Sequence, residues 1–142
     1  REPELFSRIS EEMANNKIVR DSDAIIAIDA RGFIFGSCIA LLSKKPLITA
    51  RKPGKLPGEL ITENNNLEYG SNSLSIQKEA LNKYKKIALV DDLLATGGTV
   101  KSVENIIKNQ SKTITGLLVV VELEDLSART KFNFPINSII KY

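Results

Sequence analysis

Residues 86–99 read Lys86-Ile-Ala-Leu-Val-Asp-Asp-Leu-Leu-Ala-Thr-Gly-Gly-Thr99, and this stretch decides the fold. The four apolar residues from Ile87 to Val90 predict a short buried strand, and two carboxylates stand where that strand is expected to end. A turn of small residues, 95–99, then opens a helix whose apolar positions share one face. Those positions are Val100, Val103, Ile106 and Ile107. A buried strand that passes through a glycine turn into a helix predicts one unit of an α/β fold.

The turn and the acidic pair together suit a sugar phosphate. Gly97 and Gly98 let the backbone approach a ligand closely, and the first helical turn offers free N–H groups backed by the positive end of the helix dipole. Asp91 and Asp92 can accept hydrogen bonds from hydroxyl groups such as those of a ribose. An ordinary strand-to-helix connection is the alternative for the glycines alone. Because two adjacent carboxylates repel each other, their presence favours a binding site over a plain turn.

Composition excludes several classes of protein. The chain has 142 residues, which fits a single domain over 1–142, and 42% of them are apolar. It contains no histidine, which excludes histidine-based triads and most zinc sites, and its single cysteine, Cys38, is expected in the core. The net charge of +3 is too small to indicate nucleic-acid binding and suits a polyanionic small molecule. No apolar run approaches the roughly 20 residues of a membrane span, and no signal peptide is evident, so a cytoplasmic location is expected.

The rest of the chain alternates apolar runs with helical patterns. This alternation predicts an α/β fold with a mostly parallel, twisted sheet flanked by helices, and a flexible loop and hairpin at residues 51–77. Strands are expected at 24–28, 46–50, 87–90, 115–123 and 136–140, a hairpin within 59–77, and helices at 3–13, 33–43, 100–107 and 125–132. Leu5, Phe6, Ile9 and Met13 are expected on the buried side of the first helix, and Ile34, Cys38, Leu41 and Leu42 lie at helical spacing in the second.

Three unusual loops follow strands of the expected sheet. Asp29-Ala-Arg-Gly32 follows the first strand, Arg51-Lys52 with Lys55 follows the second, and Asp91 to Thr99 follows the third. Since ligands bind at the carboxyl ends of parallel strands, the three loops should meet at one cleft. A phosphate cradle, an acidic pair and separate cations suggest a ligand with a sugar and two phosphate-bearing ends. The proline- and glycine-rich loop 51–58 is interpreted as a lid that brings Lys55 over this ligand.

A family resemblance follows from these motifs. Val90-Asp-Asp-Leu-Leu-Ala-Thr-Gly-Gly-Thr99 resembles the phosphoribosyl pyrophosphate signature of the type I phosphoribosyltransferases. Three further segments, 29–36, 51–58 and Leu67-Glu-Tyr-Gly70, resemble those members of the family that act on adenine. The resemblance runs from about Pro3 to the C-terminus. It implies transfer of a phosphoribosyl group to N9 of adenine, giving AMP and pyrophosphate, with Mg²⁺ held mainly by the substrate and not by protein ligands, in a homodimer.

The resemblance also implies roles for individual residues. The turn Ala95–Thr99 would hold the 5′-phosphate, the acidic pair the ribose hydroxyls, and Arg31 with its neighbours the pyrophosphate. Glu68, Arg31 and Lys55 are the expected catalytic residues, with Tyr69 beside Glu68 near the purine. The peptide bond between Ala30 and Arg31 is expected to be cis. The full set of expected substrate-binding residues is Ala30, Arg31, Gly32, Arg51, Lys52, Lys55, Glu68, Tyr69, Asp91, Asp92, Leu94, Ala95, Thr96, Gly97, Gly98 and Thr99.

Three alternatives stay open from the sequence. In members of this family, a segment that precedes the first helix forms a hood over the base. That helix begins here near Pro3, so the chain starts almost where the hood would end. The half of the site that holds the base is therefore expected to be incomplete. A regulator that binds phosphoribosyl pyrophosphate or a nucleotide without turnover is one rival, and an enzyme for another purine is a second. Glu68 itself can be read equally as an exposed glutamate of the hairpin.

Overall fold

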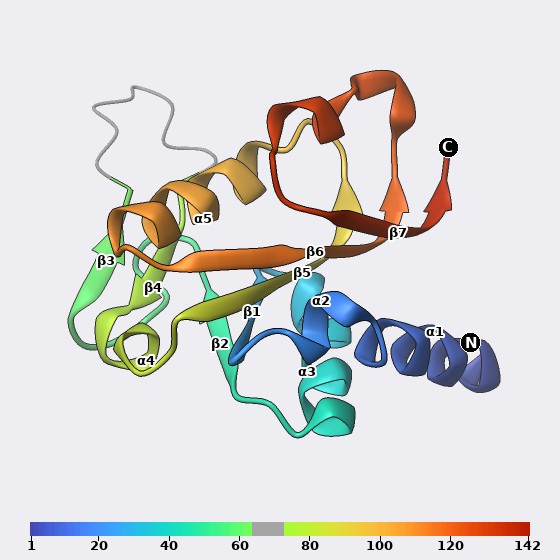
Figure 1. The fold of residues 1–142 in the computed structure, drawn as a ribbon, viewed down its shortest axis with the longest axis horizontal. Helices are drawn as coiled ribbons and strands as arrows, with labels where there is room; N and C mark the ends of the chain where they lie inside the picture. Colours follow the sequence, from blue (N-terminus) through green and yellow to red (C-terminus); the bar gives the residue numbers. More distant parts are fainter. Residues whose placement is uncertain (64–72) are drawn as a thin grey trace.

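The computed structural model describes residues 1–63 and 73–142, and its centre is a parallel sheet of five strands (Figure 1). The strand order is β2-β1-β5-β6-β7, and every neighbouring pair is parallel. The strands are β1 (Ala24–Ile28), β2 (Leu47–Ala50), β5 (Lys86–Leu94), β6 (Thr113–Glu122) and β7 (Ile136–Lys141). The predicted α/β class and mostly parallel sheet are therefore confirmed.

Helices cover both faces of this sheet (Figure 1). Helices α1 (Pro3–Ala14), α2 (Lys17–Arg20) and α3 (Gly32–Ser43) lie on one face, and α5 (Gly98–Asn109) lies on the other. Successive residues of a strand point to opposite faces, so each central strand feeds two cores. In β5, for example, Ala88 and Val90 pack toward α3, whereas Ile87 and Leu89 pack toward α5. Layers on both faces make every residue of β1 fully buried, which is why that strand is a continuous apolar run.

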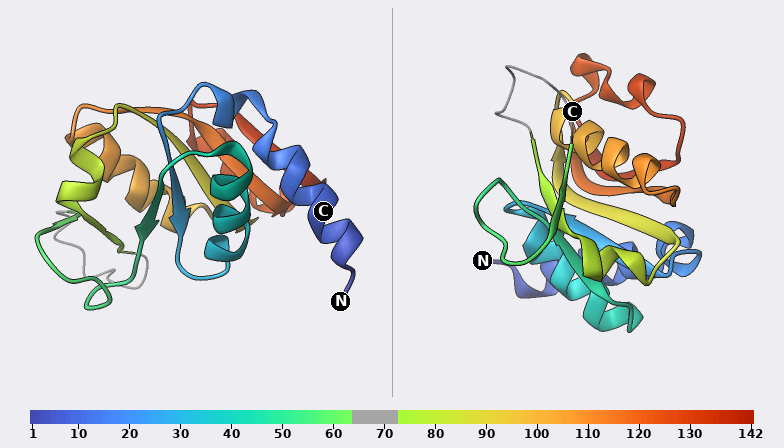
Figure 2. Two further views of the ribbon diagram at one scale, coloured as in Figure 1. Left: turned by 90° about the horizontal axis from the view of Figure 1, so that it is seen from below. Right: turned by 90° about the vertical axis from the view of Figure 1, so that its left-hand side faces the viewer.

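A small antiparallel hairpin lies beside the main sheet and is joined to the end of β2 by an antiparallel bridge between Arg51 and Ser75. Strands β3 (Leu60–Thr62) and β4 (Ser75–Gln77) pair in antiparallel register, and α4 (Lys78–Asn82) follows directly. The two further views show that this unit lies at the opposite end of the molecule from α1 (Figure 2). The hairpin agrees with the one expected within 59–77.

None of the helices within residues 1–63 and 73–142 is long and apolar enough to cross a membrane.

Strand β5 is longer than the sequence pattern predicts. It continues from Lys86 to Leu94, so the acidic pair lies within the strand and not beyond its end. The physical reason is one-sided pairing: β1 accompanies β5 only as far as Val90, whereas β6 pairs with it as far as Leu94. Asp91 and Asp92 are consequently held in extended backbone while one edge of the strand is free of a partner strand.

The helices of the first face differ more from expectation. Of the apolar residues expected on the buried side of α1, Met13 is fully buried, whereas Leu5 and Phe6 are exposed. In α3 the buried residues are Gly32, Gly36 and Ile39, whereas Ile34, Leu41 and Leu42 are exposed and Cys38 is half-buried.

The reason is close approach of α3 to the sheet. A Cβ at Gly36 would lie 2.5 Å from the Cβ of Ala27, so only the glycine side of the helix fits against β1. Ile39 packs into the core beside this glycine side, whereas Ile34, Leu41 and Leu42 face outward. The expected helix 125–132 is instead two 3₁₀ segments, η1 (Glu124–Leu126) and η2 (Ala128–Lys131), and the short α2 was not predicted.

Candidate active site

The carboxyl ends of β1, β2 and β5 meet at one edge of the sheet, as parallel pairing requires. A cavity of about 280 Å³ lies at this edge. Its lining comes from the segments that follow or end these three strands, together with the start of α5: Asp29, Ala30, Arg31, Lys52, Asp91, Asp92, Leu93 and Thr99. Six of the residues selected from the sequence are among them, and the predicted convergence of the three loops is confirmed.

The acidic pair forms the floor of this cavity. Asp91 is buried, and its Oδ1 accepts a hydrogen bond of 2.8 Å from the backbone N–H of Asp92. Asp92 is partly exposed, and its Oδ2 accepts a hydrogen bond of 2.5 Å from Nε of Arg31. Burial raises the pKa of the Asp91 carboxyl to about 8, and the neighbouring Asp92 carboxylate adds to this shift. The raised pKa favours the protonated form of Asp91, which can donate as well as accept a hydrogen bond, while the Asp92 carboxylate is held by the Arg31 guanidinium.

The loop after β1 brings Arg31 to the pair. Arg31 stands at the N-terminus of α3, and its side chain is mostly exposed. Gly32 lies so close to β5 that a Cβ there would be 3.0 Å from the Val90 carbonyl oxygen and 3.1 Å from Oδ1 of Asp91. The cis peptide bond expected in this loop lies one residue earlier than predicted, between Asp29 and Ala30, so the assignment to Ala30–Arg31 was wrong.

The loop after β2 is tied to the site by Asp29. Oδ2 of Asp29 accepts a hydrogen bond of 3.2 Å from the backbone N–H of Lys52 and lies 3.5 Å from Nε of Arg51. The guanidinium of Arg51 also lies 5.7 Å from the centre of the Phe33 ring, and its Nη1 donates to the carbonyl oxygen of Lys55 at 3.2 Å. Arg51 thus organises this loop, and Lys52 is the cation that reaches the cavity wall. The Lys55 side chain is exposed and is not part of that wall.

The glycine turn joins β5 to α5. Gly97 adopts a left-handed conformation with φ of 85°, and its carbonyl accepts the first helical hydrogen bond, 2.9 Å long, from Lys101. The N–H groups of the first turn of α5 are therefore free to meet an anion. Leu94, which precedes the turn, has a fully buried side chain in the core, so only its backbone can contact a ligand. Glu68 and Tyr69 lie outside the described residues.

Comparison with known proteins bears on this arrangement. The phosphoribosyl transferase domain family matches residues 3–133. The adenine phosphoribosyltransferase of Prochlorococcus marinus strain MIT 9312 is 56% identical over 140 residues, covering 99% of this chain and 82% of that protein. The chain belongs to the adenine phosphoribosyltransferase family.

Solved structures of the family have the same fold. Adenine phosphoribosyltransferase from Thermoanaerobacter pseudethanolicus superimposes with a TM-score of 0.87 at 36% identity, covering 99% of this chain and 82% of that one. The Saccharomyces cerevisiae enzyme, solved in complex with an imino-altritol bisphosphate and adenine, superimposes with a TM-score of 0.82 at 30% identity, covering 97% and 81%. The expected family and the parallel-sheet fold are confirmed by these matches.

Two residues of the cavity were missed in the sequence. Asp29 is one of them, and its position directly after β1 is the sequence signal that could have found it. The other is Leu93, which has no such signal because an apolar residue in a strand indicates burial and not ligand binding.

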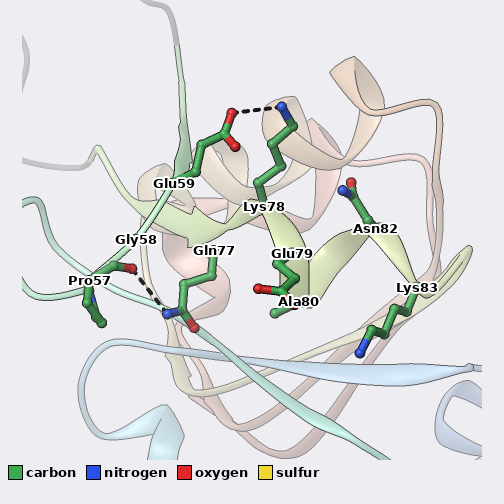
Figure 3. Close-up of a pocket in the computed structure, with 9 residues that line it drawn as sticks. All are labelled: Pro57, Gly58, Glu59, Gln77, Lys78, Glu79, Ala80, Asn82 and Lys83. Carbon is green, nitrogen blue, oxygen red and sulfur yellow. Dashed lines mark hydrogen bonds and ion pairs between the residues drawn. The ribbon is translucent and has the colours of Figure 1, made fainter.

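A second, larger cavity of about 540 Å³ lies elsewhere, between residues 57–59 and α4 (Figure 3). Its walls are held by the ion pair of Lys78 with Glu59 and by the bond from Gln77 Nε2 to the Pro57 carbonyl. None of the residues selected from the sequence lines it.

The raised pKa of Asp91 predicts how stability depends on pH. The folded protein keeps a proton on Asp91 up to about pH 8, whereas the unfolded chain loses it near 3.8. Between these values the folded state binds more protons than the unfolded chain, in which Asp91 is ionised, so the free energy of unfolding falls as pH rises, by an amount on the order of a few kcal/mol. We therefore expect Asp91→Asn to gain stability relative to the unchanged protein between pH 5 and pH 8, as measured by urea unfolding.

The matched control is Asp23→Asn. Asp23 accepts backbone hydrogen bonds from Lys85 and Lys86, and these hold its pKa below the usual range. Its contribution to stability is complete above about pH 5 and is lost only as pH falls below that, so the difference between this variant and the unchanged protein should stay constant from pH 5 to pH 8. A constant difference for Asp91→Asn as well would contradict the assignment of a proton to Asp91.

Proposed function

We propose that this chain transfers the 5-phosphoribosyl group of phosphoribosyl pyrophosphate to N9 of adenine, giving AMP and pyrophosphate. The observation that carries the proposal is the meeting of an acidic pair, two cations and a helix N-terminus around one cavity. These groups match the three parts of the donor substrate: ribose hydroxyls, pyrophosphate and 5′-phosphate. The relatives named above are adenine phosphoribosyltransferases, which supports adenine as the acceptor.

The reaction exchanges one bond at C1′ of the ribose. The C1′–O bond breaks, pyrophosphate leaves with the bonding electrons, and N9 of adenine forms the new bond and gives up its proton. Positive charge develops on the ribose during this exchange, as in other glycosyl transfers. We propose that the Asp92 carboxylate accepts a hydrogen bond from a ribose hydroxyl and stabilises that charge, while Asp91 completes the contact with the ribose.

The leaving group carries most of the negative charge. Arg31 has a planar set of donors suited to pyrophosphate, and Lys52 adds a second positive charge to the lining of the cavity. We propose that pyrophosphate competes with Asp92 for Arg31, so that the pair seen here opens when substrate binds. Glu68 is proposed to exchange the proton with a purine ring nitrogen, and Lys55 to contact pyrophosphate when the loop 51–58 closes.

Mg²⁺ is proposed to enter with the substrate. Carboxylate and phosphate oxygens are the ligands it prefers, and in residues 1–63 and 73–142 no cluster of three or more acidic, histidine or cysteine side chains forms a protein cage for it. The acidic residues that line the cavity are Asp29, Asp91 and Asp92. These carboxyl groups fit an ion held mainly by pyrophosphate oxygens. Bound there, the ion would neutralise charge on the leaving group.

The direct test is a spectrophotometric assay for nucleotide formation with adenine, hypoxanthine and guanine. We expect AMP to form from adenine, with the other two bases at least about 100-fold less efficient, because a site that hydrogen-bonds one base edge leaves polar groups unpaired against another. Turnover of a different base would replace adenine as the acceptor. Binding of phosphoribosyl pyrophosphate without turnover of any base would instead support a non-catalytic regulator.

We further propose a homodimer in which α3 packs against the same helix of a second copy. Helix α3 has no charged residue along its 12 positions, and Leu41 is 79% exposed on it. A second copy fits because an apolar face of this kind is self-complementary across a two-fold axis. We expect Leu41→Glu to shift the protein from dimer to monomer in light scattering after gel filtration. The control is Leu126→Glu, at an exposed apolar position on η1, which should leave the mass unchanged. The proposal would be contradicted if the protein without substitutions is a monomer.

A further inference from the structure

We propose that Lys131 is a positioning residue of the turn 95–99, holding the Thr96 carbonyl and adding positive charge beside the phosphate of the substrate. Lys131 was not selected from the sequence, and it lies in the 3₁₀ segment η2 near the C-terminus. The inference rests on the proposed function, because it assigns a role in binding the 5′-phosphate end of the donor. The expected consequence is selective: ribose 5-phosphate and AMP depend on Lys131, and pyrophosphate does not.

The central observation is a contact between two distant segments. Nζ of Lys131 donates a hydrogen bond of 2.6 Å to the carbonyl oxygen of Thr96, across 35 residues of sequence. Thr96 immediately precedes Gly97, the left-handed residue that turns the chain into α5. A hydrogen bond from an ammonium group fixes the plane of the peptide between these two residues, and so the direction of the Gly97 N–H. Lys131 thereby bears on the geometry of the anion-binding turn itself.

The residue after Lys131 packs against the same turn. A Cβ at Gly97 would lie 3.0 Å from the Phe132 ring and 3.5 Å from the Ala128 side chain. Phe132 is buried, stacks on Phe134 with ring centres 5.2 Å apart, and lies 5.6 Å from the ammonium of Lys101. The ring therefore supports the turn from one side while Lys131 holds its carbonyl.

Segment η2 is itself firmly anchored. Arg129 donates two hydrogen bonds to the buried carboxylate of Glu122, at 3.0 and 2.6 Å, and a third of 2.6 Å to the Ile136 carbonyl oxygen. These bonds join η2 to the ends of β6 and β7. Because its base is fixed, Lys131 reaches the turn from a defined direction and not from a freely moving segment.

The charge of Lys131 is also uncompensated. The described residues contain seven ion pairs, and Lys131 takes part in none of them. Lys101, whose ammonium lies over the Phe132 ring, is by contrast paired with Glu104 at 2.8 Å. A cation without a carboxylate partner keeps its attraction for an anion, so Lys131 is the lysine beside this turn whose charge remains for a bound phosphate.

The test compares Lys131→Gln, which removes the charge but keeps a hydrogen-bond donor, with Lys131→Arg, which keeps both. We expect Lys131→Gln to raise the dissociation constant of ribose 5-phosphate, and KM for phosphoribosyl pyrophosphate, about tenfold. Lys131→Arg should restore both to within about threefold of the unchanged protein. The dissociation constant of pyrophosphate and kcat should change less than about twofold, because the lost interaction is the same in ground and transition states.

The matched control is Lys45→Gln. Lys45 also donates a hydrogen bond to a backbone carbonyl, that of Arg20 at 2.9 Å, but it does not line the cavity. This variant should leave unchanged the dissociation constants of ribose 5-phosphate and pyrophosphate, KM for phosphoribosyl pyrophosphate, and kcat. Equal ribose 5-phosphate affinity in Lys131→Gln and the unchanged protein would overturn the inference. Parallel loss of ribose 5-phosphate and pyrophosphate binding, without rescue by Lys131→Arg, would assign Lys131 a purely structural role and also overturn it. If the unchanged protein binds no ribose 5-phosphate by calorimetry, the proposed function fails, and this inference fails with it.

Discussion

The double variant Asp91→Asn with Asp92→Asn is expected to bind phosphoribosyl pyrophosphate about 100-fold more weakly, since a hydrogen bond to the charged Asp92 carboxylate contributes about 1.5–3 kcal/mol and one to a protonated Asp91 about 0.5–1.5 kcal/mol. The structure sharpens this expectation. Asp92 offers the partly exposed carboxylate of the cavity, whereas Asp91 is buried and carries a raised pKa. Asp92→Asn alone should therefore cause most of the loss, and isothermal calorimetry on both single variants and the double variant measures each share.

Pyrophosphate provides an internal comparison for this variant. Loss of the Asp92 carboxylate frees Arg31 from its ion pair, so the affinity for pyrophosphate should be retained or increased. Asp125→Asn, an exposed carboxylate on η1, controls for net charge and should leave both affinities unchanged. Undiminished affinity of the double variant for phosphoribosyl pyrophosphate would remove the ribose role assigned to the pair.

Gly32→Ala is expected to lower kcat/KM about tenfold, because a methyl group this close to β5 forces the binding groups to shift by a few tenths of an ångström, and catalysis is sensitive to such misplacement. The new methyl group would lie 3.0 Å from the Val90 carbonyl oxygen and 3.1 Å from both Cα and Oδ1 of Asp91. Strand β5 is central in the sheet and cannot yield, so the N-terminus of α3 must move outward. That movement carries Arg31 away from Asp92 and disturbs the Asp91 carboxyl. Steady-state kinetics with adenine and phosphoribosyl pyrophosphate measure the loss.

Gly36→Ala is the matched control for this substitution. It adds the same methyl group on the same side of α3, where the contact is with Ala27 of β1 at 2.5 Å. Overpacking there should lower the free energy of unfolding by about 1–3 kcal/mol, as for Gly32→Ala. Gly36 lies one helical turn from the cavity, so the folded protein should retain most of its activity. Equal loss of activity in the two variants would show that α3 moves as a whole and would contradict the local effect.

The sequence was sufficient for the layered fold because its signals are local. Ile87–Val90, the apolar stripe of α5 and the glycine turn each report their own backbone conformation, and parallel pairing then brings the three loops to one edge. All four residues expected on the buried side of α5 are buried. The acidic pair, Arg31 and Lys52 could be placed together for the same reason, since a parallel sheet offers one carboxyl edge.

Features that depend on how one segment packs against another could not be predicted from local sequence patterns. The extension of β5 through Asp91 and Asp92 is set by the length of β6, and the outward orientation of Leu41 is set by the fit of Gly36 against Ala27. Helical spacing shows which residues share a face, but the neighbouring element decides whether that face is covered.

Two kinds of information therefore meet in this site. The α/β fold, the phosphate turn and the family can be predicted from consecutive residues, because backbone preference and motif spacing are local properties. The raised pKa of Asp91, the hydrogen bond between Asp29 and Lys52, and the contact of Lys131 with Thr96 depend on the folded arrangement. Each of these arises from burial or from atoms brought together across many residues, and neither quantity is a property of a local stretch of chain.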